Sequence, residues 1–152
     1  MVDPSLQPID VHVVTDPIEA KAVARFTAVE FWGIEEPSDK DVSDILSEAN
    51  QLGETRVAAF DEEGKVLAAA GLVRVTLGGE KSGFLMDLAT ISGKRHRGLG
   101  SNVVRYVERL AKENDIKTLE ISGVTPVAVT FYEKLGYQRG SSEADFRKRL
   151  LA

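Results

Sequence analysis

Three consecutive strand patterns between residues 55 and 91 constrain the fold more than any other feature of this 152-residue sequence. Apolar residues fill three runs that two short turns separate, with strands at 56–60, 66–77 and 84–91 and turns at 61–65 and 78–79. Short glycine-containing connections join antiparallel neighbours, so we predict a three-stranded meander. A meander in this position argues against a dinucleotide-binding fold, which opens with a strand–helix–strand unit.

Helix and strand patterns continue on both sides of the meander. Before it we predict a strand at 9–14 and two helices, the first from Pro17 to Trp32 behind an Asp16 cap, the second between Ser38 and Gly53. After it come a helix at 101–114, a strand at 117–122, a short helix at 125–136 and a hairpin at 137–150. We expect a single α/β domain over residues 3–152, with a mixed, mostly antiparallel twisted sheet of about 6–7 strands flanked by about 4 helices.

The composition excludes several classes of function. The sequence has no cysteine and only two histidines, so we expect no metal site. Its net charge of -5 argues against nucleic-acid binding and weakly favours cationic ligands. No apolar run approaches the length of a membrane span, and no secretory signal opens the chain, so we expect a cytoplasmic protein that does not bind membranes.

The segment from Leu88 to Ser101 carries the clearest chemical signal. A strand runs through a basic, glycine-rich turn into an amphipathic helix, and the turn holds Lys94, Arg95, His96 and Arg97. Glycines let a backbone approach a ligand closely, and the free amides of a helix N-terminus bind anions, so a phosphate site is predicted. The alternative is a simple turn with a solvated basic surface. The nucleoside triphosphate motif and the third glycine of the dinucleotide motif are both missing.

Two ordered motifs resemble those of the GNAT superfamily of N-acetyltransferases. The run Arg95-His96-Arg97-Gly98-Leu99-Gly100 is similar to the family signature R/Q-x-x-G-x-G/A, whose amides hold the pyrophosphate of coenzyme A. The run from Ala128 to Gly136-Tyr137 is similar to the family segment A-x-x-[LF]-Y-x-x-x-G-[FY]. The resemblance extends to the expected order of elements and covers nearly the whole chain, apart from residues 1–8 and 140–152.

The resemblance implies which residues bind acetyl-CoA, and it implies no metal. Backbone groups of Leu88, Ala89 and Thr90 would bond the pantetheine arm. The diphosphate would be held by Arg95, His96, Arg97, Gly98, Leu99, Gly100 and Ser101. The second motif adds Thr125, Phe131 and Tyr132. Thr125 departs from the asparagine that is frequent in the family, and its alternative role is a helix cap.

Acetyl transfer to an amine needs a base for the amine and a proton donor for the departing thiolate. The resemblance makes Tyr132 the donor; its alternative is a hydrogen-bonded core tyrosine. For the base we place Glu120 slightly ahead of Asp87, because Glu120 stands in a strand expected to be buried on both faces. For either carboxylate the alternatives are a structural ion pair and a water relay.

In the family, the region between the first two helices helps to form the acceptor pocket. Phe31 and Trp32 lie there and are candidate acceptor contacts, although core packing is favoured for Trp32. We expect an N-acetyltransferase that moves the acetyl group of acetyl-CoA to a primary amine of a small molecule or peptide by direct attack. The alternative is a non-catalytic acyl-CoA-binding regulatory module. Homodimers are common in the family.

Overall fold

The structure is a computed structural model that describes residues 9–91, 98–140, 142 and 144–151. Over these residues, seven strands form one sheet in the order β1-β2-β3-β4-β5-β7-β6. The strands are β1 (Asp10–Val13), β2 (Thr55–Phe60), β3 (Val66–Leu77), β4 (Glu80–Thr90), β5 (Thr118–Ile121), β6 (Gln138–Arg139) and β7 (Phe146–Arg149). The helices are α1 (Pro17–Glu30), α2 (Asp39–Leu52), α3 (Leu99–Glu113) and α4 (Val129–Lys134), and a 3-10 turn, η2 (Pro126–Ala128), leads into α4.

The strand pairing confirms the predicted meander and the predicted parallel step. Strands β2, β3 and β4 pair antiparallel in sequence, and β5 pairs parallel with β4 after the α3 crossover. The expected C-terminal hairpin is present, but β7 inserts between β5 and β6. All pairs except β4–β5 are antiparallel, so the sheet is mixed and mostly antiparallel, as expected.

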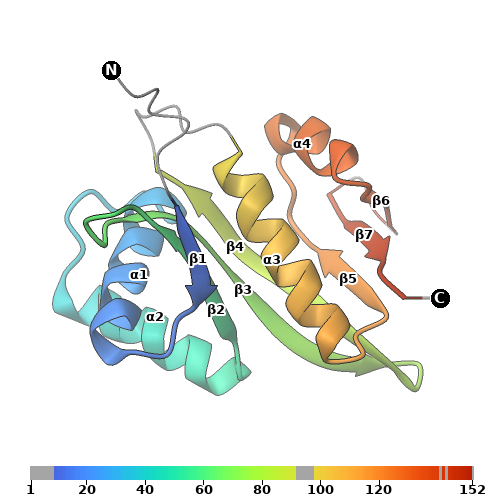
Figure 1. Cartoon of the computed structure of the whole chain (residues 1–152), viewed down its shortest axis with the longest axis horizontal. Helices are drawn as coiled ribbons and strands as arrows, with labels where there is room; N and C mark the ends of the chain where they lie inside the picture. Colours follow the sequence, from blue (N-terminus) through green and yellow to red (C-terminus); the bar gives the residue numbers. More distant parts are fainter. Residues whose placement is uncertain (1–8, 92–97, 141, 143, 152) are drawn as a thin grey trace.

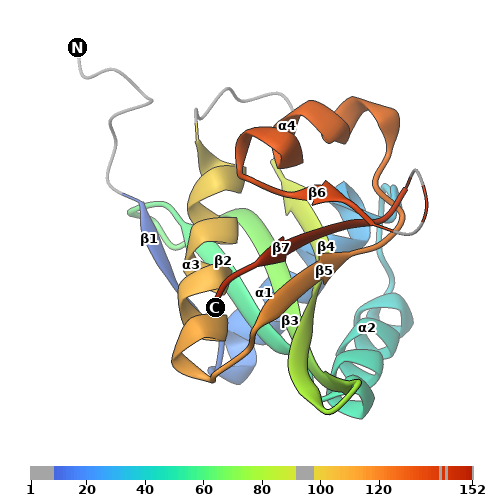
Figure 2. The ribbon, with the colours of Figure 1, turned by 90° about the vertical axis from the view of Figure 1, so that its right-hand side faces the viewer.

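Helices cover the two faces of the sheet unequally (Figures 1 and 2). Helix α3 packs its apolar stripe, including Val103, Val104 and Val107, on one face and forms the main core there. Helix α1 packs on the opposite face through Val23, which contacts a second cluster around Phe60. Helices α1 and α2 lie over β1, β2, β3 and β4, and no described helix covers that face of β5 and β7. Glu120 on β5 is therefore only half-buried there, and its neighbour Arg147 on β7 is exposed.

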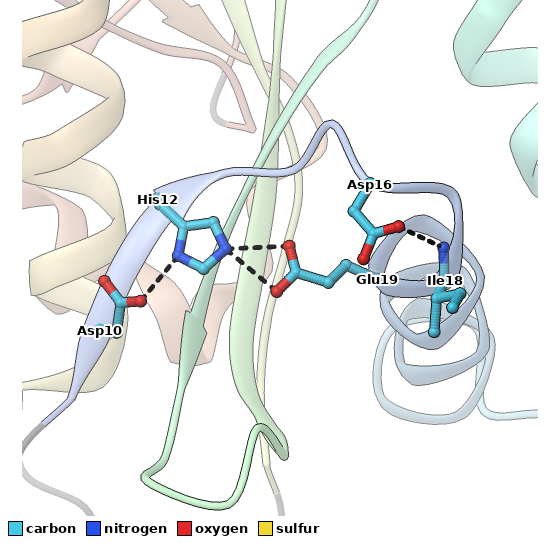
Figure 3. Close-up of polar contacts among 5 residues, drawn as sticks. All are labelled: Asp10, His12, Asp16, Ile18 and Glu19. Atoms are coloured by element: carbon cyan, nitrogen blue, oxygen red, sulfur yellow. Dashed lines mark hydrogen bonds and ion pairs between the residues drawn. The ribbon is translucent and has the colours of Figure 1, made fainter.

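Local signals fix the ends of the N-terminal helices. The Asp16 carboxylate accepts a hydrogen bond from the Ile18 amide, 3.1 Å away, and caps α1 as predicted (Figure 3). In the same view, His12 on β1 lies between Asp10 and Glu19, with ring nitrogens 3.0 Å from an oxygen of each. This contact joins the edge strand to α1. Ser38 starts α2 with a capping box, and Gly53 ends it at φ 65°.

Strands β4 and β5 separate after a short region of pairing. Their ladder runs from Ser82–Thr118 to Phe84–Glu120 and ends there, although β4 continues to Thr90. The distal half of β4 therefore faces a gap on its β5 side. The residues at which the resemblance implies pantetheine contacts, Leu88–Thr90, belong to this half of β4. Among the described helices, none is both long and apolar enough to cross a membrane.

Candidate active site

The gap between the splayed strands is a cleft of about 560 Å³. Residues of β3 and β4 form one wall, and residues that follow β5 form the other, together with α4. Most of the lining is apolar. Its polar side chains include Asp87 on β4 and Tyr132 on α4, two of the residues predicted to take part in catalysis.

Asp87 enters the cleft because β4 bulges at this point. The pairing with β3 shifts between Ala69 and Gly71, so that Asp87 and Leu88 oppose a single residue of β3. Asp87 adopts φ 51°, a left-handed conformation that aspartate tolerates better than most residues. Its side chain is 22% exposed. Burial raises the pKa of the Asp87 carboxyl, an effect that Arg56 opposes and that Glu54 and Glu48 reinforce.

A network of buried polar side chains lies next to Asp87. The Arg56 guanidinium lies 4.0 Å from Asp87, 2.6 Å from Glu54 and 2.7 Å from the Thr27 hydroxyl on α1. Arg56 therefore pairs mainly with Glu54 and only loosely with Asp87. Gly71 makes room for this arrangement, because a Cβ there would overlap the Glu54 carboxylate. Sequence reasoning missed this network, since its members are distant in sequence and form no motif.

Tyr132 faces the same cleft from α4. Its side chain is 6% exposed and packs edge-on against Phe131 and Tyr137, with ring centroids 5.0 and 5.7 Å away. No hydrogen bond joins its hydroxyl to any residue that the structure describes, whereas the Tyr137 hydroxyl donates to Glu108. Burial raises the pKa of Tyr132 to about 12, so its phenol stays protonated at physiological pH.

A second cavity, of about 390 Å³, adjoins the first at Leu88 and ends at the N-terminus of α3. Gly98 caps this helix at φ 80° and offers no side chain to its first-turn amides. A Cβ on Gly100 of α3 would lie 3.2 Å from the Phe131 ring of α4, so glycine leaves space in the cavity between these two helices. Free amides and the helix dipole make such a site suitable for a diphosphate.

The structure places the predicted coenzyme contacts at one end of the site. Leu88, Thr90 and Phe131 line the cavity with residues 98–101, whereas Ala89 is 7% exposed and packs in the core. The helix begins at Leu99, two residues before the predicted start. Arg95, His96 and Arg97 lie outside the described residues.

The expectation that Glu120 is buried on both faces of its strand was wrong. Helix α3 covers β5 on one side only, where Leu119 and Ile121 are buried. Glu120 is half-buried on the other side and lines a separate surface hollow with Arg147, its cross-strand neighbour. The structure therefore brings Asp87 and Tyr132 into one cleft and leaves Glu120 out of its lining.

Two further expectations need correction. Trp32 is 56% exposed, so core packing does not explain it; it contacts Phe31 edge-on, and Phe31 lines the cleft. Thr125 occupies the position before η2, makes no side-chain capping bond and lines the cleft, so its alternative role as a helix cap is wrong. Within the described residues, no group of three acidic or histidine side chains is arranged to hold a metal ion.

Comparison with known structures finds the same fold in acetyltransferases. The chain is similar to a GNAT family N-acetyltransferase of Escherichia coli in complex with CoA, with a TM-score of 0.73 and 20% identity over 99% of this chain and 85% of that one. It is also similar to glucosamine-6-phosphate N-acetyltransferase of Arabidopsis thaliana, with a TM-score of 0.70 and 17% identity over 90% and 96% of the two chains.

Sequence comparison agrees with the structural comparison. A protein of Bacillus subtilis (strain 168), named as a candidate acetyltransferase, is 38% identical over 73 residues, and the match spans about half the length of each protein (48%). The model of the acetyltransferase (GNAT) family matches residues 21–137, which include the cleft, the helix N-terminus and Tyr132. The chain therefore belongs to the acetyltransferase (GNAT) family, whose members use acetyl-CoA.

Proposed function

We propose that this protein transfers the acetyl group of acetyl-CoA to a primary amine by direct attack of the amine on the thioester. The observation that carries this proposal is that the two cavities share Leu88 in their linings. An anion-binding helix end lies in one cavity, and a carboxylate and a phenol lie in the other. Placing the helix end in one cavity and the carboxylate and phenol in the other suits a long co-substrate, whose phosphates and thioester are at opposite ends.

The position of Asp87 supports a role as the base. The acceptor arrives as an ammonium and must lose a proton before its nitrogen can attack. A carboxylate whose pKa is raised by burial accepts a proton more readily near neutral pH than an ordinary aspartate. Asp87 lines the cleft with Tyr132, and Glu120 does not, so we assign the base to Asp87.

Tyr132 is proposed as the donor to the departing sulfur. Its hydroxyl keeps its proton and has no partner among the described residues, so it is available to a ligand. The C–N bond forms as the C–S bond breaks. Of the two protons that leave the ammonium nitrogen overall, one passes through Asp87 to solvent. The other replaces the proton that Tyr132 gives to the thiolate sulfur, so coenzyme A departs as the free thiol.

Thiol release in the presence of acetyl-CoA and an amine panel tests this function. Tyr132→Phe should lower kcat by about 10²-fold, in the range of a lost proton donor, while acetyl-CoA affinity is kept. Tyr106→Phe on α3 removes a phenol outside the cleft and should leave kcat unchanged. Equal rates for wild type and Tyr132→Phe would contradict the role of Tyr132.

The base is tested by the pH dependence of kcat/KM. Asp87→Asn should abolish the acidic limb of the profile, which reports the ionisation of Asp87 with a pKa above the ordinary aspartate value. Glu120→Gln should retain that limb. Loss of the limb in Glu120→Gln, with its retention in Asp87→Asn, would move the base to Glu120. Acetyl-CoA binding without acetylation of any amine would support a non-catalytic module instead.

A further inference from the structure

The half of the cleft that faces α1 and α2 is apolar. This half is lined by Phe31 at the end of α1 and Leu52 at the end of α2. The rest of it is one face of β3 and β4, here called the outer face, with Val73, Val75, Phe84 and Met86. Phe31 and Leu52 are 43% and 44% exposed, unusually high for large apolar side chains that line a concave surface. They offer apolar area that a ligand would bury.

A single charged side chain, Asp87, lines the described part of this cleft. The positive charge nearest to it, on Arg56, is mostly neutralised by Glu54. Asp87 therefore presents a net negative charge beside the apolar residues of the cleft. This favours a ligand with one cationic group and an apolar body.

The same lining disfavours other acceptors. Its described residues include no lysine or arginine to pair with a phosphate, so an amino-sugar phosphate would leave its phosphate without a partner among them. The same described residues include no second carboxylate for the additional ammonium groups of a polyamine. Each of these acceptors would lose water from polar groups without regaining equivalent contacts.

We propose that the acceptor is a primary amine carried on an apolar, aromatic or branched aliphatic body. The ammonium pairs with Asp87, and the body packs against Phe31 and the outer face of β3 and β4. This inference rests on the proposed function, because it names the acceptor of the same site. The Trp32 ring packs edge-on against Phe31, which lines the cleft.

The test compares kcat/KM for 2-phenylethylamine, ethylamine, spermidine and glucosamine 6-phosphate by thiol release. Burial of one ring should make 2-phenylethylamine at least about tenfold better than each of the others. If spermidine or glucosamine 6-phosphate matches or exceeds it, this inference is overturned while the proposed function stands. If a protein that binds acetyl-CoA acetylates none of the four, this inference is overturned, and the wider amine panel decides the proposed function separately.

A variant pair separates specificity from structural damage. Phe31→Ser should lower kcat/KM for 2-phenylethylamine by about tenfold and leave the value for ethylamine nearly unchanged. Ile18→Ser removes another exposed apolar side chain of α1, one that is 79% exposed and lies outside the cleft lining, and should change neither value. A parallel loss with both amines in Phe31→Ser would assign Phe31 a structural role and overturn the proposed contact.

Discussion

Gly71→Ala should destabilise the protein by displacing the Glu54 carboxylate. A methyl group at this position overlaps Glu54, which must turn out of its site and leave Arg56. The two side chains are 5% and 14% exposed, so the broken contact is a buried ion pair. Removing one partner of such a pair costs about 3–5 kcal/mol, and Arg56 keeps its bond to Thr27, so we expect the lower end, about 3 kcal/mol.

A double-mutant cycle isolates this effect, with chemical denaturation as the assay. Gly71→Ala should cost about 3 kcal/mol in the wild-type background, a fall in Tm of roughly 6–12 °C for a chain of this size. In a Glu54→Ala background the overlap is gone, and Gly71→Ala should be neutral or stabilise by up to about 1 kcal/mol. Equal costs in both backgrounds would refute the reasoning, and so would a neutral Gly71→Ala in the wild type.

Two further predictions concern charged side chains, one on α3 and one on β1. Ser101→Glu places a negative charge in the first turn of α3, where the helix dipole favours it, so Tm should stay the same or rise, as it should for Asn102→Glu on the same turn. A fall of several degrees for either variant would show that the turn lacks the unpaired amides described above. The hydrogen bond to Glu19 and its charge raise the pKa of His12, so protonated His12 stabilises the fold. This contribution is complete below the unfolded pKa of about 6.5 and disappears as pH rises through the higher folded pKa. Glu19→Gln should flatten that part of the pH–stability curve; an unchanged curve would contradict it.

The sequence predicted the elements well because their signals are local. Caps at Asp16 and Ser38, glycines at turns and the apolar stripe of α3 each depend on a few neighbouring residues. The meander followed from short turns, and the parallel β4–β5 pair followed from the helix between them. The start of α3 was predictable too, since a glycine turn before an amphipathic helix is itself a local pattern. An anion site there stays a prediction.

The catalytic end depended on contacts that no local pattern encodes. The bulge that turns Asp87 into the cleft arises from pairing with β3, and Glu120 is only half-buried because no described helix covers its face of β5. The exposure of Trp32 depends on where α1 ends against the sheet. For these reasons the sequence ranked Glu120 above Asp87, whereas we propose the reverse order. Homodimer formation stays a prediction.

Calorimetric titration with acetyl-CoA tests the central claim most directly. The account predicts binding of one molecule per chain by the wild type, and loss of that binding in Ser101→Glu, whose new charge lies in the cavity beside the helix N-terminus. Asn102→Glu, outside the cavity lining, should bind more strongly than Ser101→Glu. Undiminished binding by Ser101→Glu, or none by the folded wild type, would contradict the assignment of this cavity to the coenzyme.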